Sequence, residues 1–220
     1  MTEIIISENI KKRIPHLSLG CVECRVDILE ENHDLWQEID AVSRVLSLSA
    51  ELSDVGSHPA IRASRQAYKA CGKDPARYRL SSEALMRRIV KGNQLYKINN
   101  VVDLVNLVSL KSGMSIGGYD ADKIRGLVSF DIGLKDEPYE AIGRGELNIE
   151  NLPVFRDNLS AFGSPTSDSV RTCVTSGTRK FLMIIVGFSG SVQTNLTLNL
   201  ALSLLEKYAN AGEIETILVK

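Results

Sequence analysis

The fold of this chain is decided by the stretch VVDLVNLVSLKSGMSIGGYD, residues 101–120. Seven of its first ten residues are apolar, which predicts a largely buried helix over 101–112 that ends at Gly113. The pair Gly117-Gly118 follows, and glycines permit a left-handed backbone and a close approach to a ligand. Two interpretations stay open, a ligand-binding bend or a turn that needs glycine geometry.

On the N-terminal side of this stretch, helical patterns dominate. A helix that begins after His58-Pro59 should end at Gly72, because proline favours the first turn and glycine the position after the last. Ser81 or Ser82 is expected to cap the next helix. We expect helices over 34–52, 59–71, 81–91, 101–112 and 191–211, with Gly212 capping the last.

On the C-terminal side, short apolar pieces alternate with turn residues, which predicts strands. An earlier segment, 21–29, alternates between apolar and polar residues and should be a half-buried strand. We expect strands over 3–6, 21–29, 127–132, 139–142, 152–155, 172–175, 181–186 and 214–219. The order predicts an α+β fold of mixed sheets packed with helices, with a helical N-terminal half and a strand-rich C-terminal half, as a single domain over 1–220.

The composition excludes several classes of protein. Apolar residues make up 44% of the 220 residues and charged residues 24%, which is typical of a globular chain and not of disorder. The longest apolar run, 181–186, is far shorter than the roughly 20 residues of a membrane span. The N-terminus lacks the layout of a secretory signal, and four cysteines are too few for a disulfide scaffold. We expect a cytoplasmic protein.

The net charge of −1 conceals a basic segment over 61–97, in which ten Lys and Arg oppose two acidic residues, a local charge of +8. Tyr68, Tyr78 and Tyr96 lie in the same segment. Basic residues with interleaved aromatics suit a polyanion with unpaired bases. The alternative is a solvated helix pair whose acidic neighbours come from elsewhere in the fold.

Other candidate motifs are weak. Cys21 and Cys24 have zinc-like spacing, but a strand would place them on opposite faces and no second pair follows, so we expect buried thiols and no metal. The three histidines lie in no catalytic motif. The stretch 187–191 lies between a strand and a helix, where a nucleophile elbow or a plain turn would occur, and we favour the turn.

The central stretch resembles a known family, the B3/B4 domain of the phenylalanyl-tRNA synthetase beta subunit. The likeness extends loosely over 62–187, and the segments Arg65–Arg88 and Gly163–Thr178 resemble the free-standing form of that domain. The matching positions are Val102, Asp103, Val105, Asn106, Gly113, Ser115, Gly117, Gly118, Tyr119, Asp120, Asp122 and Lys123.

In the synthetase this domain edits, by hydrolysing tyrosine wrongly esterified to the phenylalanine tRNA. The resemblance therefore implies a stand-alone domain that hydrolyses mischarged aminoacyl-tRNA in trans. An aminoacyl ester is already activated, so a positioned water and oxyanion donors suffice without a covalent nucleophile. Two positions depart from the family, because Val105 replaces its threonine and Gly117 its histidine. The substrate side chain is therefore not inherited, and a non-catalytic tRNA- or RNA-binding module, or a small-molecule hydrolase, stays an alternative.

These considerations assign the candidate residues, with tRNA or aminoacyl-tRNA as the partner, no membrane, no metal and no cofactor. Asp103 and Asp120 also match the family, and we expect both to be structural. We expect Asn106 and Asp168 to be catalytic. We expect the substrate to contact Ser115, Gly117, Gly118, Tyr119 and Ser164. We expect the RNA to contact Arg62, Arg65, Lys69, Arg77, Arg79, Arg87 and Arg88.

Overall fold

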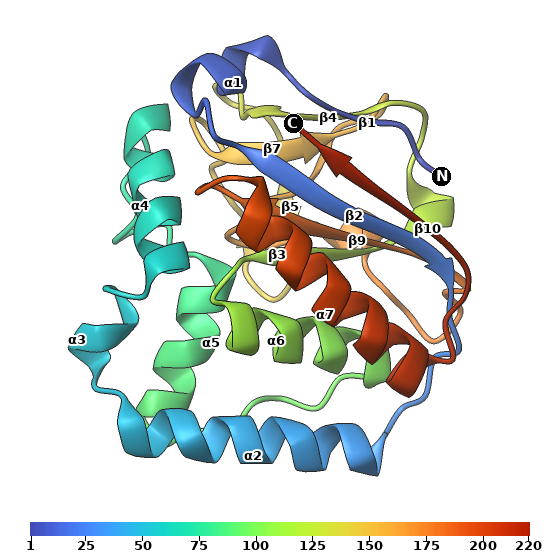
Figure 1. Cartoon of the computed structure of the whole chain (residues 1–220). Helices are drawn as coiled ribbons and strands as arrows, with labels where there is room; N and C mark the ends of the chain where they lie inside the picture. Colours follow the sequence, from blue (N-terminus) through green and yellow to red (C-terminus); the bar gives the residue numbers. More distant parts are fainter.

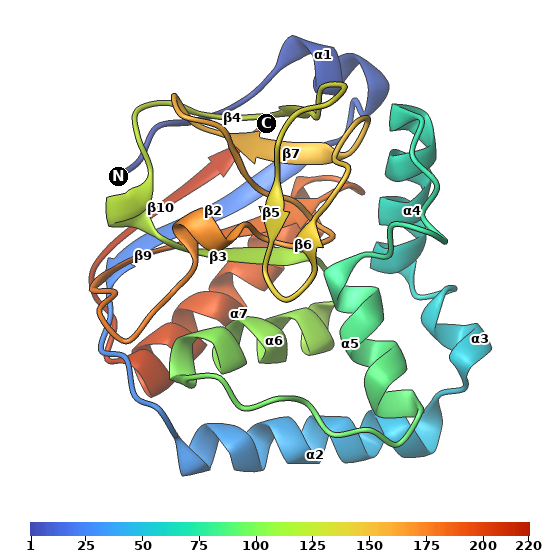
Figure 2. The same ribbon diagram turned by 180° about the vertical axis from the view of Figure 1, so that it is seen from behind.

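The computed structural model describes residues 1–220, arranged as stacked layers of sheet and helix (Figures 1 and 2). The helices are α1 (Glu8–Arg13), α2 (His33–Ser49), α3 (Leu52–Val55), α4 (Pro59–Cys71), α5 (Ser81–Val90), α6 (Asn100–Ser112) and α7 (Ser191–Ala209). The strands are β1 (Ile4–Ile6), β2 (Ser18–Arg25), β3 (Ile116–Asp120), β4 (Val128–Ile132), β5 (Glu140–Ala141), β6 (Gly145–Glu146), β7 (Pro153–Arg156), β8 (Ala161–Gly163), β9 (Lys180–Gly187) and β10 (Gly212–Val219). The α+β fold is confirmed, and no helix has the length and apolarity to cross a bilayer.

The central sheet is antiparallel in the order β10-β2-β9-β3. Helices α6 and α7 cover one face, and the second sheet lies over the other (Figure 1). An ideal Cβ on Gly20 of β2 would lie 3.6 Å from Leu198 Cβ of α7, so strand and helix are in close contact. Strand β2 is therefore buried on both faces, and the expectation of a half-buried strand over 21–29 is wrong in its burial and its bounds.

The second sheet has the order β1-β4-β7-β8, in which β1 runs parallel to β4. Aromatic rings join it to the central sheet, because Tyr119 of β3 lies edge-on to Phe162 of β8, with ring centroids 5.0 Å apart. The ring centroids of Phe155 of β7 and Phe130 of β4 are 4.4 Å apart. Such pairs contribute about 0.5–1.5 kcal/mol each beyond their burial, and they make the two sheets one continuous core.

The helix boundaries around the deciding stretch follow local capping chemistry. Gly72 and Gly113 have left-handed backbones, with φ of 89° and 72°, and end α4 and α6 as predicted. The Asn99 side chain accepts the backbone N–H groups of Val101 and Val102, which opens α6. These boundaries depend on neighbouring residues, so the sequence predicts them well.

Other boundaries differ from the predictions. The first long helix ends at Ser49, and a separate short helix, α3, follows. Neither predicted serine caps α5: Leu80 holds the cap position without a side-chain bond, and the Ser82 hydroxyl pairs with Ser115 at 3.2 Å. Asn210, not Gly212, ends α7 with φ of 47°, because a short amide side chain tolerates the left-handed region.

The strand expected over 172–175 is absent. A 3-10 helix, η2 (Val170–Thr172), takes its place, because the Ser169 hydroxyl accepts the N–H of Arg171 and tightens the backbone. Threonine and valine favour strands, yet here this local hydrogen bond and the tertiary partners of the Arg171 side chain decide the conformation.

The glycine pair is neither a bend nor a turn. Gly117 and Gly118 lie inside β3 and pair with Ile184 and Met183 of β9, and neither has a positive φ. The reason for glycine at 117 is space, because a Cβ there would collide with the folded-back ring of Tyr119.

We predict that Gly117→Ala destabilises the protein by about 1–3 kcal/mol, because the added methyl overpacks the site of a fully buried ring. Urea unfolding measures the change. Gly177→Ala is the matched control, since a Cβ there would meet no atom closer than 3.7 Å. Equal stability of the two variants would contradict the packing argument.

Candidate functional site

A cavity of about 370 Å³ opens beside α6, and ten of its fifteen lining residues are hydrophobic. Its lining residues come from α5, α6, β3 and the loop before β9, and Figure 2 shows α5 and α6 side by side below the sheet. Ile98, Ile142 and Val170 line it and are themselves 55%, 47% and 39% exposed, so they form its mouth. The site is therefore an apolar pocket with an apolar rim.

One face of α6 supplies a wall of the cavity. Val102, Val105, Asn106 and Ser109 all line it, and their spacing of three and four residues places them on one side of a helix. Neither the Asn106 amide nor the Ser109 hydroxyl has a hydrogen-bond partner within the chain, although Ser109 is 2% exposed. Two polar groups without a partner in the chain thus line a mostly apolar cavity, together with Ser81 and Asp168.

The structure brings together three of the seven residues predicted to be catalytic or to contact the substrate. Asn106, Gly118 and Asp168 line the same cavity although they come from a helix, a strand and a distant loop. A Cβ on Gly118 would approach Phe181 Cε2 at 3.1 Å and Val105 Cγ2 at 3.2 Å, so this glycine keeps the cavity open.

The other four predicted residues lie behind the wall. Because side chains alternate along β3, Ile116 and Gly118 face the cavity while Gly117 and Tyr119 face the second sheet. Ser115 is buried against Ser82. The expectation that a substrate contacts Gly117 is therefore corrected, since the Tyr119 ring fills the space beside this glycine.

Ser164 also supports the site from behind. Its hydroxyl donates to the Ser167 carbonyl at 2.9 Å and accepts the N–H groups of Thr166 and Ser167. The Tyr139 hydroxyl donates to the same Ser167 carbonyl at 2.7 Å. These bonds hold the turn that ends at Asp168, so Ser164 positions the carboxyl group and does not line the cavity.

Asp168 has a perturbed carboxyl group. The Tyr119 hydroxyl donates to its Oδ1 at 2.8 Å. Burial raises the pKa of Asp168 to about 7, against the lowering effect of Tyr119 and of the backbone at Gly118 and Ser164. Its remaining accessible surface faces the cavity, which is itself walled by protein. A carboxyl group with this pKa exchanges protons near neutral pH.

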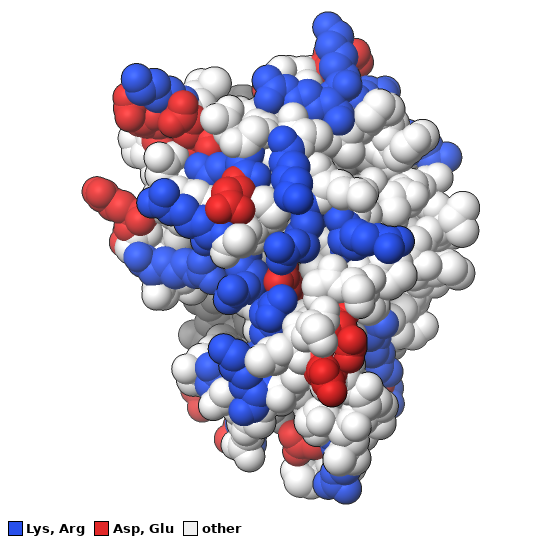
Figure 3. Space-filling view, turned by 90° about the vertical axis from the view of Figure 1, so that its left-hand side faces the viewer, with Lys and Arg blue, Asp and Glu red and all other residues white.

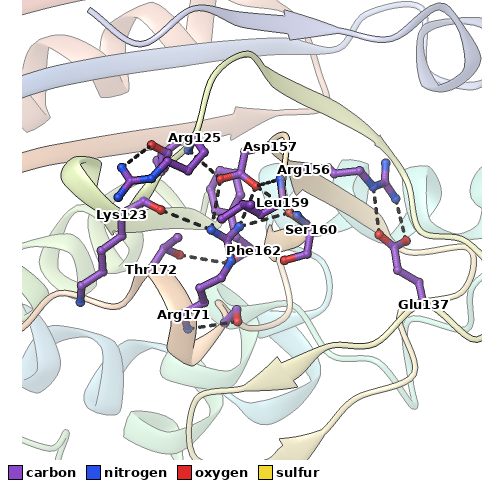
Figure 4. Close-up of polar contacts among 12 residues, drawn as sticks. Lys123, Arg125, Glu137, Arg156, Asp157, Leu159, Ser160, Phe162, Arg171 and Thr172 are labelled. Carbon is purple, nitrogen blue, oxygen red and sulfur yellow. Dashed lines mark hydrogen bonds and ion pairs between the residues drawn. The ribbon is translucent and has the colours of Figure 1, made fainter.

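A buried ion pair holds the cavity wall in place (Figure 4). Arg171 of η2 donates to both carboxylate oxygens of Asp157, at 2.8 and 3.1 Å, and to the carbonyls of Lys123 and Ser160. Asp157 also accepts the Arg125 N–H at 2.8 Å. The residue before Arg171 in the chain, Val170, lines the cavity mouth, so this network fixes the wall from behind.

Some cations of the basic segment are paired with a carboxylate inside the protein. Fewer of them are therefore free for RNA than the sequence predicts. The Glu83 carboxylate is fully buried and pairs with Arg65 at 2.9 Å and Arg87 at 2.8 Å, with Arg79 at 3.9 Å. Lys73 is also buried and donates to two backbone carbonyls. The predicted contacts of Arg65, Arg79 and Arg87 with RNA therefore compete with a structural role.

Four of the remaining cations form a basic face over α4, the loop after it and α5. Arg62, Lys69 and Arg77 are exposed and belong to no ion pair. Figure 3 shows a band of Lys and Arg on the side of the molecule where α4 and α5 lie. We call Arg62, Lys69, Arg77 and the partly exposed Arg88 the basic face.

Several other candidate residues are structural. Asp103 accepts the Trp36 indole N–H at 2.7 Å and the Ile98 N–H at 3.1 Å, and Asp120 accepts the Thr178 hydroxyl at 2.8 Å. Cys21 and Cys24 are buried free thiols. No group of three or more His, Cys, Asp or Glu side chains is placed to hold a metal ion.

Sequence reasoning missed Ser109, together with Val105 as part of the cavity wall. A signal was present, because Asn106 and Ser109 are polar positions three residues apart, on one side of a helix that is apolar at most of its central positions. The partners of that wall, Phe181 and Val170, are more than sixty residues away and carry no such signal.

Residues 63–210 of this chain match a family model described as "B3/4 domain". The chain therefore belongs to the B3/4 domain family. A solved structure of similar fold is an N-terminal fragment of the phenylalanyl-tRNA synthetase beta subunit from Pyrococcus horikoshii, 15% identical, with a TM-score of 0.50. The match covers 99% of this chain but 50% of that one. No curated protein matches.

We predict that Asp168→Asn removes a pH dependence of stability. The pKa of about 7 in the folded protein lies above the value of 3.8 expected for Asp168 in the unfolded chain. Between these two pH values the folded protein binds more protons than the unfolded chain, so the free energy of unfolding falls as the pH rises from about 4 to about 7. Relative to the wild type, the variant should gain stability between pH 4 and pH 8, by more than about 1 kcal/mol. Urea unfolding of both proteins at several pH values measures the difference. A difference that does not change with pH would contradict the assigned pKa.

Proposed function

We propose that this protein binds the acylated 3′ end of a tRNA and hydrolyses the aminoacyl ester in trans. Membership of the B3/4 family and the likeness to a synthetase beta-subunit fragment support the RNA class. The observation that carries the proposal is the apolar cavity that contains the Asp168 carboxyl group together with the unpaired Asn106 and Ser109. An aminoacyl ester has the same combination of an apolar side chain and polar backbone groups.

The proposed chemistry uses water as the nucleophile. Water attacks the ester carbonyl carbon and its proton passes to the Asp168 carboxylate. The protonated Asp168 then gives this proton to the ribose oxygen as the bond between that oxygen and the carbonyl carbon breaks, which releases the amino acid and restores the carboxylate. A base with a pKa of about 7 is ionised in a large fraction of molecules at neutral pH and still accepts a proton. The Asn106 amide is suited to hydrogen-bond the carbonyl oxygen as negative charge develops there.

We further propose that the preferred amino acid has an apolar side chain. The wall beside Gly118 consists of Val105, Ile116 and Phe181, which offer no hydrogen bond to a phenol or hydroxyl group. Val105 stands where the family carries threonine, so this wall loses a polar group. Burial of a polar side chain here without a partner would be unfavourable.

The whole chain, residues 1–220, is proposed to act as one domain in the cytoplasm. A single core cluster of 57 buried residues connects both sheets and the helices, which supports the domain assignment. The four free cysteines are compatible with a reducing compartment.

The test is release of amino acid from a panel of aminoacyl-tRNAs. We predict that esters of apolar amino acids decay at least tenfold faster with the protein than in buffer, and that Asp168→Asn lowers the enzymatic rate by about a hundredfold or more. Gly118→Ala should slow release of bulky amino acids because its methyl group reaches toward Phe181. Gly177→Ala, which is outside the cavity, is the control. Decay at the buffer rate for every ester would exclude hydrolysis.

A second candidate function is a non-catalytic RNA-binding module. The basic face favours it, because none of these four cations is paired with an internal carboxylate and all of them lie outside the cavity. Lys and Arg that neutralise phosphates bind RNA of any sequence and release counterions, which makes the affinity fall with salt. Under this alternative the tRNA binds without release of its amino acid.

We predict that the triple variant Arg62→Ala, Lys69→Ala, Arg77→Ala binds deacylated tRNA more weakly and lowers the slope of log affinity against log salt by up to about 3. Filter binding at several salt concentrations measures it. The control removes Arg25 at the end of β2, Arg179 directly before β9 and Lys207 in the last turn of α7. These ends of the three elements lie on the side of the molecule opposite α4 (Figure 1). The same slope in both triple variants would remove the basic face from the RNA-binding surface.

A further inference from the structure

Tyr96 has a large aromatic side chain that is exposed to solvent. It is 68% exposed and lies in the irregular segment between α5 and α6. The Arg88 guanidinium lies over its ring, 4.1 Å from the centroid. Arg88 is itself fixed, because its Nε donates to the Gln94 carbonyl at 2.6 Å. One face of the ring is thus covered by a cation, and the high exposure leaves the other face free.

This stacked pair lies beside the mouth of the cavity. Ile98 lines the mouth and follows Tyr96 by two residues, which in extended chain is about 7 Å. Arg88, the other member of the pair, belongs to α5, and Leu85, one turn earlier in the same helix, lines the cavity. Both members of the pair are therefore only two or three residues along the chain from residues of the cavity wall.

The arrangement fits a nucleobase next to an acyl group. In the 3′-terminal nucleotide of an acylated RNA, a single ribose separates the ester from the base. An aminoacyl group in the cavity therefore brings its base to the rim, within reach of Tyr96. An exposed aromatic face binds an unpaired base of any identity by stacking, and a cation on the opposite face suits the adjacent phosphate.

We propose that Tyr96, held by Arg88, is the stacking platform for the terminal nucleobase of the acylated RNA whose aminoacyl group occupies the cavity. This inference rests on the proposed function, and it names which residue outside the cavity recognises the RNA end. Tyr78 differs from Tyr96, because its ring is covered by Lys73 at 3.8 Å and is half-buried. Of the tyrosines in the basic segment, Tyr96 therefore has the free face.

The experiment compares two small probes on the full chain. One is 3′-leucylamino-3′-deoxyadenosine, a stable amide in place of the ester, and the other is the same leucylamino ribose without a base. Calorimetry measures the dissociation constants for the wild type, Tyr96→Ala and Tyr96→Phe. Lys91→Ala, which removes a nearby exposed cation, is the control, and thermal unfolding checks that each variant is folded.

We expect Tyr96→Ala to weaken binding of the adenosine probe at least fivefold and to leave binding of the baseless probe unchanged. Tyr96→Phe and Lys91→Ala should stay within twofold of the wild type, because stacking needs the ring and not the hydroxyl group. Unchanged adenosine binding by Tyr96→Ala overturns the platform and leaves the proposed function standing. An equal loss for both probes also overturns it, since Tyr96 would then shape the cavity. Absence of wild-type binding to either probe, with no ester release from any aminoacyl-tRNA, overturns the proposed function itself.

Discussion

The hydroxyl group of Tyr119 links the parts of this molecule that matter most. Its ring lies between two glycines, Gly117 on its own strand and Gly163 on the second sheet, and neither position has room for a Cβ. The ring packs against Phe162, and its hydroxyl donates to Asp168. One residue therefore joins the two sheets and holds the carboxyl group of the cavity, so packing of the core and geometry of the site cannot vary independently.

Strand β3 separates core from cavity by the simple alternation of its side chains. The face that bears Gly117 and Tyr119 packs into the core, and the face that bears Ile116 and Gly118 lines the cavity. This arrangement explains how two adjacent glycines serve different purposes, one making room for the Tyr119 ring and the other for the cavity. It also places Gly117 away from the cavity.

Several arginines are likewise paired with carboxylates inside the protein and are not free for a partner molecule. The buried Glu83 holds Arg65 and Arg87, and Asp157 holds Arg171, because a buried carboxylate without a partner would be strongly unfavourable. These pairs tie α4 to α5 and η2 to the second sheet. The cations left over, on the basic face and at the Arg88–Tyr96 stack, are not paired with an internal carboxylate, and they are the ones for which we propose an RNA partner.

The sequence by itself determined the helices whose caps are local, such as α4 and α6 with Gly72 and Gly113, the α+β class, and the family to which the central stretch belongs. Asn106 and Asp168 were also predicted as site residues, although a role in hydrolysis stays a prediction. The tertiary structure alone decided which side of β3 faces the cavity, that 170–172 is a 3-10 helix, and which arginines are neutralised. The physical reason is that these features depend on partners distant in the chain, and residue counts and periodicity carry no record of which distant groups meet.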